Sequence, residues 1–327
     1  MKKKAIIFGI TGQDGSYLAE ILISKGYKVY GIVRKSATGN LENIIHLVDN
    51  KKVFNKQLFL LKGDLLDVNS IYRVITDVKP DEIYNEADQD HVGWSYDIPS
   101  YSMDITSSSV VKILEAIKAI KPDIKYFQPC SSNMFGITKT KYLNEGSAFN
   151  PQSIYAIGKV SAFHTVNYYR NTFNLYCSTG IFFNHESPRR QTEYVSRKIT
   201  STVAKIYYKK TNELSLGDIS AIIDWGYAKE YMEAAYKILQ LNQSQNFIIG
   251  TGHSYSVKEF MEEAFNYVGL NPDNYLKINK KLIRPSKTSP LLADNKKAKK
   301  IIKFNPKIFG KKLVHKMMEH DLKIEKV

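Results

Sequence analysis

Cysteine is scarce in this chain, with only Cys130 and Cys177 among 327 residues. Two thiols without metal-ligand spacing exclude a disulfide-stapled secreted domain and a zinc-ribbon site. We therefore expect a protein of a reducing compartment, placed in the cytoplasm, that holds no metal.

Long apolar runs are also missing. The apolar segment 5–10 runs into glycine and aspartate, and no stretch approaches the about 20 apolar residues that a membrane span needs. Neither a signal peptide nor a membrane-spanning helix is therefore expected.

Acidic residues are too few to balance the basic ones: 47 Lys+Arg against 32 Asp+Glu give a formal net charge of +15. Such an excess is compatible with nucleic-acid binding. The lysines, however, are scattered, with clusters only at 2–4 and 296–312, and no basic-aromatic RNA-binding motif occurs. We interpret the excess as a solvated surface, so no nucleic-acid partner is expected.

The composition itself is that of a globular protein. Hydrophobic residues make up 43 % and charged residues 24 %, which excludes a disordered, collagen-like or coiled-coil chain. Short apolar runs predict strands, and apolar residues at helical spacing predict the helices between them. The predicted strands are 5–8, 28–33, 58–61, 82–84, 125–128 and 177–182, and the predicted helices are 12–25, 68–78, 107–120 and 153–171. This alternation predicts an α/β fold with a doubly wound parallel sheet.

The pattern changes after Asn184. Polar loops, isolated strands at 214–216 and 246–249, and a helix at 257–268 follow. A chain of this length is also expected to form two domains, or one large domain with an appended lobe.

A glycine-rich segment, 9–15, joins the first predicted strand to the first predicted helix. Glycines at this place permit a tight turn and close approach of the backbone to a pyrophosphate, which the amide groups of the helix N-terminus bind. The candidate cofactor-binding residues here are Gly9, Thr11, Gly12, Gln13, Asp14 and Gly15.

The residues that end the second predicted strand select the ribose of the cofactor. An acidic residue there binds the 2′-hydroxyl of NAD, but this chain has Arg34, Lys35 and Ser36. Electrostatics thus favours the 2′-phosphate of NADP, unless Arg34 stacks on the adenine. Further on, Asp64, followed by Leu65, is expected either to bind the adenine amino group or to cap a helix.

Tyr155 and Lys159 lie one helical turn apart, on the same face of a predicted helix. A neighbouring cation lowers the pKa of a phenol, so Tyr155 is expected to serve as a base near neutral pH. Ser131 and Ser132 follow a predicted strand and are placed to hydrogen-bond the same hydroxyl group.

With these motifs in view, the chain resembles extended short-chain dehydrogenases, and among them the GDP-mannose 4,6-dehydratase family, over nearly its whole length. The resemblance rests on the segments 9–18 (GITGQDGSYL), 184–190 (NHESPRR) and 224–226 (DWG). It implies a Rossmann domain, 1–183 with about 217–243, and a smaller α/β lobe for the GDP-sugar, 184–216 and 244–327. It also implies a homotetramer. The substrate-binding residues it implies are Ser132, Asp90, Asn184, Val195, Lys198 and Arg284.

The family reaction, as the resemblance implies it, oxidises the sugar at C4, then removes the C5 proton with a glutamate, expels the C6 hydroxyl and returns the hydride. The position of that glutamate is Asn133 in this chain. A carboxamide has no useful basicity near neutral pH. The chain therefore has the residues for C4 oxidation, but it lacks the base that removes the C5 proton.

We therefore interpret the chain as a GDP-sugar C4 dehydrogenase that acts on a manno-configured hexose or heptose. The alternatives are a 4,6-dehydratase with a displaced base, for which Asp90 is the first candidate, a 4-keto-type epimerase, and an inactive or RNA-binding Rossmann protein. Net oxidation shifts the expected cofactor to tightly bound NAD(H), with NADP(H) second. It also calls for a second oxidant, for which a small 2-oxo acid is our candidate.

Overall fold

The computed structural model describes residues 2–35, 40–282 and 289–326. These residues form two compact units. The first consists of the chain up to residue 136 with 148–182 and 232–247, and the second of 137–147, 183–231 and the chain from 248 onward.

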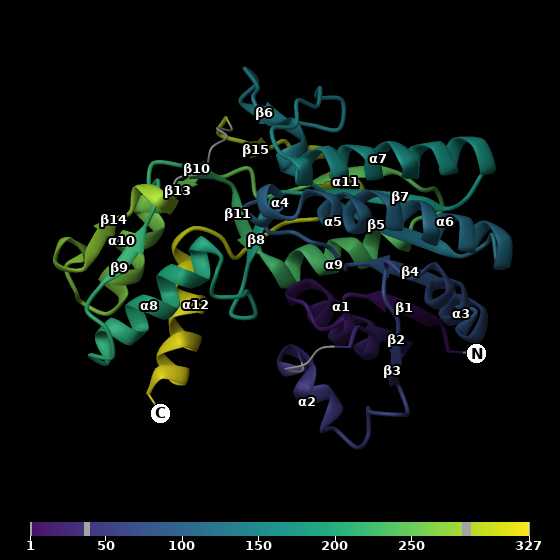
Figure 1. Cartoon of the computed structure of the whole chain (residues 1–327), viewed down its shortest axis with the longest axis horizontal. Coiled ribbons are helices and arrows are strands. Elements are labelled where there is room, and N and C mark those ends of the chain that lie inside the picture. Colours follow the sequence, from purple (N-terminus) through teal and green to yellow (C-terminus); the bar gives the residue numbers. More distant parts are fainter. Residues whose placement is uncertain (1, 36–39, 283–288, 327) are drawn as a thin grey trace. The chain divides into compact units, whose positions relative to one another are not determined.

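A parallel sheet is the framework of the first unit. Among the described residues, seven strands form it in the order β12-β7-β5-β4-β1-β2-β3, and the pairs from β7 to β3 are parallel (Figure 1). The strands are β1 (Lys4–Phe8), β2 (Lys28–Val33), β3 (Leu58–Lys62), β4 (Glu82–Asn85), β5 (Lys125–Ser131), β7 (Cys177–Phe182) and β12 (Asn246–Ile249). Because the chain winds in opposite directions from β1 and β4, ligands of such folds bind at the carboxyl ends of these two strands.

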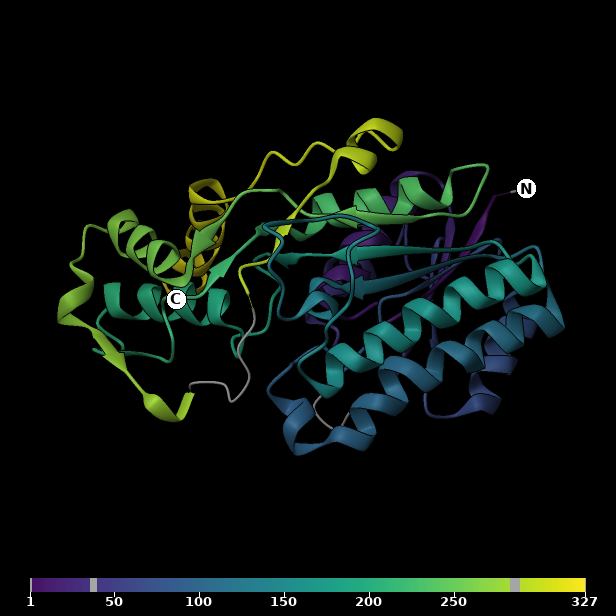
Figure 2. The same ribbon diagram turned by 90° about the horizontal axis from the view of Figure 1, so that it is seen from above.

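Helices cover both faces of this sheet. Figure 2 shows α6 and α7 side by side on one face, with α9 on the other. The helices are α1 (Gln13–Ser24), α2 (Ile45–Val48), α3 (Val68–Val78), α4 (Trp94–Asp97), α5 (Pro99–Met103), α6 (Ser109–Ile120), α7 (Ile154–Phe173) and α9 (Ala228–Leu239). Shorter turns are η1 (Glu42–Ile44), the π-helical η2 (Asp104–Ser108) and η3 (Ser132–Phe135).

Local sequence fixes where the helix of the candidate base begins and ends. Ser153 caps α7 by accepting a hydrogen bond from the backbone N–H of Ala156 at 3.2 Å. Asn174 ends the helix in the left-handed conformation, with φ 54°, which asparagine tolerates better than most residues. These ends place Tyr155 and Lys159 in the first two turns of α7.

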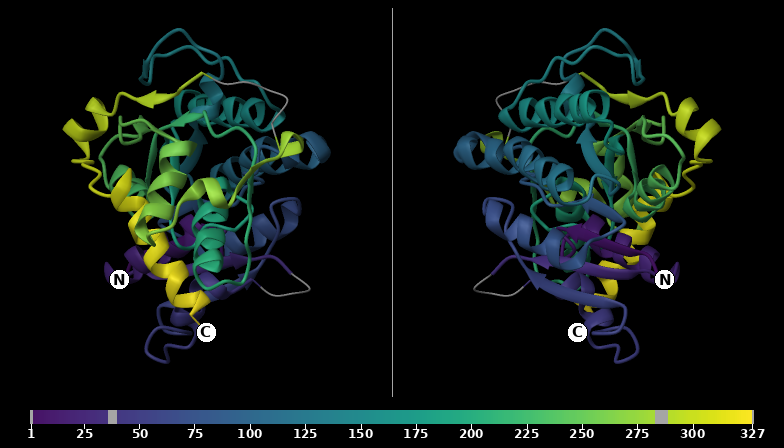
Figure 3. Two further views of the ribbon diagram at one scale, coloured as in Figure 1. Left: turned by 90° about the vertical axis from the view of Figure 1, so that its left-hand side faces the viewer. Right: turned by 90° about the vertical axis from the view of Figure 1, so that its right-hand side faces the viewer.

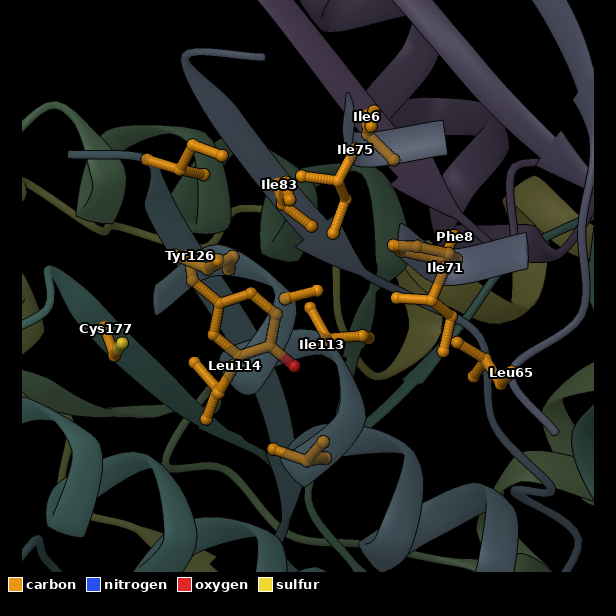
Figure 4. Close-up of a cluster of buried hydrophobic side chains, with 14 of the residues drawn as sticks. Ile6, Phe8, Leu65, Ile71, Ile75, Ile83, Ile113, Leu114, Tyr126 and Cys177 are labelled. Carbon is orange, nitrogen blue, oxygen red and sulfur yellow. The ribbon is translucent and has the colours of Figure 1, made fainter. Parts of the chain in front are cut away.

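A buried aliphatic cluster holds α3 and α6 against β1 and β4 (Figure 4). Ile71 and Ile75 of α3 and Ile113 of α6 are fully buried with Ile83 of β4. Each such side chain stabilises the fold by roughly 1.5–3 kcal/mol through removal from water. The cluster thus fixes β4, whose carboxyl end carries site residues.

Short paired strands and three packed helices make up the second unit. The strands pair as β6 (Tyr142–Leu143) with β15 (Leu292–Ala293), β8 (Asn184–Glu186) with β11 (Trp225–Tyr227), β9 (Leu214–Leu216) with β14 (Leu276–Ile278), and β10 (Ile222–Ile223) with β13 (Tyr255–Ser256). Helices α8 (Val195–Tyr207), α10 (Val257–Tyr267) and α12 (Lys311–Glu325) pack on one another, and α12 is the yellow helix that ends at the C-terminus in Figure 3. The remaining elements are α11 (Lys296–Ile301), η4 (Pro272–Asn274) and η5 (Lys280–Leu282).

The predicted doubly wound parallel sheet is confirmed, with each predicted strand of 5–182 present in it. One prediction was wrong: the segment 246–249 is not an isolated strand but forms β12, the edge strand beside β7. The segment 137–147 groups with the second unit because β6 pairs with β15. Cys130 and Cys177 are buried free thiols. No helix in the described part of the chain is long and apolar enough to cross a bilayer.

Candidate active site

The glycine-rich loop connects β1 to α1 in a turn that only small residues permit. Gly9 has φ +79°, and a Cβ on it would lie 2.6 Å from the backbone of Glu86 and Ala87. At Gly15 a Cβ would meet the backbone of Ile10 at 2.7 Å. The loop therefore lies directly against the carboxyl end of β4.

A cavity of about 530 Å³ follows the carboxyl ends of β2 and β3. Four basic residues and two acidic ones are among its lining. These are Arg34, Lys35, Lys62, Arg73, Asp64 and Asp67. The Arg34 guanidinium donates a hydrogen bond to the Tyr101 hydroxyl at 2.7 Å, which orients it. An adenosine group with a nearby phosphate fits this combination of shape and charge.

Asp64 lines this cavity, and it does not cap α3. Its Oδ1 accepts a hydrogen bond from the backbone N–H of Leu66 at 2.9 Å, whereas Asp67 caps the helix by accepting from Asn69. Leu65 is buried in the core cluster, so its side chain is a packing residue.

Tyr155, Lys159 and Ser131 meet at the carboxyl end of β5. All three are buried, at 7 %, 4 % and 8 % exposure, and Ser131 and Tyr155 share a side-chain hydrogen bond. The Lys159 ammonium lies 5.7 Å from the centre of the Tyr155 ring and donates to the backbone oxygen of Pro129 at 2.9 Å. The three residue types predicted to act together are thus in contact.

The electrostatics of Tyr155 differ from the expectation. Burial raises the pKa of Tyr155 above its ordinary value, and the charges of Asp88 and Asp90 act in the same direction. Lys159 and the hydrogen bond from Ser131 lower that pKa, but by less than burial raises it. The effect of Lys159 on the pKa thus has the expected direction, but burial and the two carboxylates outweigh it.

Asp88 is the site residue that sequence reasoning missed. Its Oδ2 lies 2.5 Å from Lys159 Nζ, and the two side chains are only 11 % and 5 % exposed. Its Oδ1 accepts hydrogen bonds from Thr106 Oγ1 at 2.6 Å and from the backbone N–H of Gln89 at 2.8 Å. The signal in the sequence was the alternation of acids at 86, 88 and 90 directly after β4, which places side chains of an extended segment on one side.

Glu86 lies beside the glycine-rich loop. Burial raises its pKa well above the usual range; Asp14 adds to this effect and Lys159 opposes it. Its Oε1 is buried and has no hydrogen-bond partner in the described part of the chain. A buried oxygen of this kind ordinarily has a partner, so this atom and the adjacent glycine-rich loop fit a bound dinucleotide.

Asn133 follows Ser131 in the 3-10 turn η3. Its backbone N–H donates to Ser131 Oγ at 3.2 Å, and its side chain is half-buried. Ser132 between them is buried. Asp90 is exposed, yet it is near enough to act on the charge of Tyr155.

A sequence profile of the GDP-mannose 4,6-dehydratase family matches residues 6–317. The chain belongs to this family. GDP-mannose 4,6-dehydratase 1 of Arabidopsis thaliana is 41 % identical over 331 residues, which cover 99 % of this chain and 91 % of the relative. GDP-mannose 4,6-dehydratase of Vibrio cholerae is 35 % identical over 353 residues, which cover 99 % of this chain and 95 % of the relative.

Solved structures of other nucleotide-sugar enzymes share the fold of this GDP-mannose 4,6-dehydratase family member. dTDP-glucose 4,6-dehydratase of Bacillus anthracis in complex with NAD has a TM-score of 0.85 at 19 % identity and covers 99 % of this chain and 98 % of that one. UDP-glucose 4-epimerase of Thermotoga maritima with UDP-glucose has a TM-score of 0.85 at 19 % identity and covers 98 % and 99 %. At these identities the likeness establishes the Rossmann fold alone.

Of the predicted GDP-sugar residues, Ser132 and Asp90 belong to the first unit, and Asn184, Val195 and Lys198 to the second. Asn184 begins β8 and is exposed, while Val195 and Lys198 are half-buried in the first turn of α8. Arg284 lies outside the described residues. Within the described ranges no group of three His, Cys, Asp or Glu side chains is arranged to hold a metal ion.

Proposed function

We propose that this chain oxidises the C4 hydroxyl of a GDP-manno-configured sugar and releases the 4-keto sugar with its C6 hydroxyl intact. The observation that carries the proposal is Asn133, which stands where the family resemblance implies a glutamate base. The C4-oxidation residues Tyr155, Lys159 and Ser131 are retained beside it.

In the proposed first step, Tyr155 accepts the proton of the C4 hydroxyl. The Ser131 hydroxyl hydrogen-bonds Tyr155 and stabilises its ionised form, and Lys159 contributes a positive charge held at Pro129. A nicotinamide cofactor, when bound, would supply the acceptor for the C4 hydride and, in its oxidised form, a further positive charge in the site. That charge favours the phenolate form that burial otherwise disfavours.

The second half of the family reaction needs a group that accepts the C5 proton. The Asn133 carboxamide is neutral at any ordinary pH and cannot take a proton from carbon. Among the nearby acids, Asp88 is engaged with Lys159 at 2.5 Å, and Glu86 has a pKa raised by burial, which favours its neutral form. These features support an oxidation that stops at the 4-keto sugar.

A second candidate is full 4,6-dehydration with Asp90 as the base. Family membership favours it, because the relatives in Arabidopsis thaliana and Vibrio cholerae are named GDP-mannose 4,6-dehydratases. The exposed carboxylate of Asp90 acts on Tyr155, so it lies in the same region as the reacting hydroxyl. Asp90→Asn separates the candidates, because it abolishes dehydration and leaves simple oxidation in place.

For the cofactor, we propose NADP(H), which the sequence analysis ranked second to NAD(H). The cavity beside β2 and β3 presents Arg34, Lys35, Lys62 and Arg73, and four cations suit a ribose 2′-phosphate better than a free hydroxyl. The nucleotide released from the purified protein by denaturation identifies the cofactor. If that nucleotide is NAD(H), the NADP(H) proposal is wrong, and the earlier expectation of NAD(H) from net oxidation is correct.

Product mass is the direct test of the proposed reaction. The protein is incubated with GDP-mannose and, separately, with a GDP-manno-heptose, and the sugar nucleotides are analysed by mass spectrometry. Loss of two hydrogens supports the proposal and loss of water supports the dehydratase. An unchanged mass with inverted C4 configuration supports an epimerase. The faster of the two substrates decides between hexose and heptose.

A further inference from the structure

Hydrogen bonds from several elements hold the ion pair between Asp88 and Lys159 in place. Lys159 comes from α7 and also donates to Pro129 of β5 at 2.9 Å. Asp88 comes from the loop after β4 and is held by Thr106 of η2 at 2.6 Å and by the backbone of Gln89 at 2.8 Å. These contacts hold the Asp88 carboxylate in a fixed position beside the ammonium group.

This pair changes what Lys159 does to Tyr155. An ammonium group alone beside a phenol lowers the pKa of the phenol, but a carboxylate 2.5 Å from the ammonium cancels much of its field at short range. We propose that Asp88 is a positioning residue that fixes the Lys159 ammonium and offsets the positive charge that Lys159 presents to Tyr155. The inference rests on the proposed function in that Tyr155 is the base of the C4 oxidation.

Two other acids of the described chain act on this pair. One is Glu86, which interacts with Lys159 and whose pKa burial raises well above the usual range, so its neutral form is favoured. Asp90, from the same loop as Asp88, also raises the pKa of Tyr155, but it is exposed and therefore screened by solvent. Burial lowers the pKa of Lys159, whereas Asp88, Tyr155 and the thiol of Cys130 raise that pKa above its ordinary value. Asp88 is thus a buried carboxylate, paired with Lys159, that opposes the effect of Lys159 on the base.

The test is the pH profile of C4 oxidation in Asp88→Asn, which removes the charge and keeps the shape. We expect the rising limb of kcat/KM to move to lower pH by roughly one unit, the size of shift that one close charge produces. Asp88→Glu keeps the charge, so the rising limb of its pH profile is expected at the same pH as in the wild type. Thr106→Val keeps the charge but removes one of its hydrogen bonds, so the rate should fall while the limb stays. Asp104 is an exposed acid in the π-helical turn η2, which also contains Thr106. Asp104→Asn is therefore the matched control for loss of one negative charge.

A second readout does not depend on turnover. Tyrosine labelled with carbon-13 at the ring carbon that bears the hydroxyl reports ionisation by NMR, and the Tyr155 signal is the one missing from Tyr155→Phe. The same downward shift is expected in Asp88→Asn. If neither the rising limb of kcat/KM nor the Tyr155 titration moves, the inference is overturned. If Asp88→Asn does not fold, Asp88→Ser provides the same test. If no GDP-sugar is oxidised but the Tyr155 titration moves, the proposed function fails and the electrostatic role of Asp88 stands.

Discussion

The backbone N–H of Asn133 donates a hydrogen bond to Oγ of Ser131, which itself hydrogen-bonds Tyr155. Residue 133 is therefore tied to the candidate base through one serine. A carboxylate introduced at this position is therefore expected to lie near the candidate base. This relationship makes Asn133 the sharpest place to test which half of the family reaction the chain performs.

Asn133→Glu is predicted to restore removal of the C5 proton. A correctly placed general base accelerates proton transfer by about 10²–10⁴-fold, so incorporation of deuterium at C5 from heavy water should rise at least about 10²-fold over wild type. Asn133→Gln is the control, because it has the length of glutamate without its charge. If the wild-type protein already exchanges this proton rapidly, Asp90 or another group is the base, and the dehydratase hypothesis replaces the dehydrogenase.

Tyr155→Phe is predicted to abolish hydride transfer while GDP-sugar binding is nearly unchanged. The substitution removes only the ionisable oxygen from a buried ring, so the rate of nicotinamide reduction should drop by about 10²–10⁴-fold. Tyr168→Phe, at a 54 % exposed tyrosine of the same helix, is the matched control. Wild-type rates of reduction in Tyr155→Phe would remove Tyr155 from the mechanism.

Much of the architecture could be predicted because strand–helix alternation is a local property of the sequence. Apolar runs and helical spacing identified the central strands and helices, and the glycines marked a turn where backbone lies against backbone, at Gly9 and Ala87. The edge strand β12 was not predicted as part of the sheet, because its pairing with β7 joins segments about 70 residues apart. No local pattern reports such a contact.

Electrostatics was the part of the site that local reasoning could not supply. The Tyr155–Lys159 spacing is visible in the sequence, but Asp88 and Thr106 reach the pair from other elements. The pKa of Tyr155 depends on the sum of burial and all these charges. The sequence motif therefore identifies Tyr155 and Lys159, but only the fold shows which other charges act on the pKa of Tyr155.

A buried ion pair in the second unit yields a prediction about stability. Arg197 of α8 and Asp321 of α12 lie 2.7 Å apart at 9 % and 2 % exposure. Removing one partner of a buried pair leaves the other uncompensated, so Arg197→Met should lower the free energy of unfolding by about 3–5 kcal/mol near pH 8. Lys277→Met breaks the exposed pair with Glu213 and should cost under about 1 kcal/mol.

The cost of Arg197→Met is also predicted to depend on pH. Burial raises the pKa of Asp321 to about 6, and Arg197 opposes this rise, so the pKa is higher still in the variant. A carboxyl whose pKa is raised by folding contributes stability below its unfolded pKa of about 3.9, and this is lost as the pH rises through the folded pKa. Denaturant unfolding at pH 5 should therefore show a smaller difference between wild type and variant than at pH 8. An equal difference at both pH values would show that Asp321 does not titrate in this range.

The last prediction concerns the fate of the hydride. A dehydratase returns the hydride to C6 in each turnover, so its bound cofactor is regenerated without any other oxidant. If the reaction stops at the 4-keto sugar, each bound cofactor oxidises one sugar and remains reduced. Purified protein given GDP-sugar alone is then expected to form at most one equivalent of product, with the near-ultraviolet absorbance of a reduced nicotinamide. Sustained turnover should require free oxidised cofactor or a second substrate. A 2-oxo acid is our candidate, because its carbonyl carbon can accept the hydride and its oxygen the proton of Tyr155, giving one 2-hydroxy acid for each 4-keto sugar. Many turnovers without added acceptor or cofactor would mean that the hydride returns to the sugar, and the dehydrogenase proposal would be wrong.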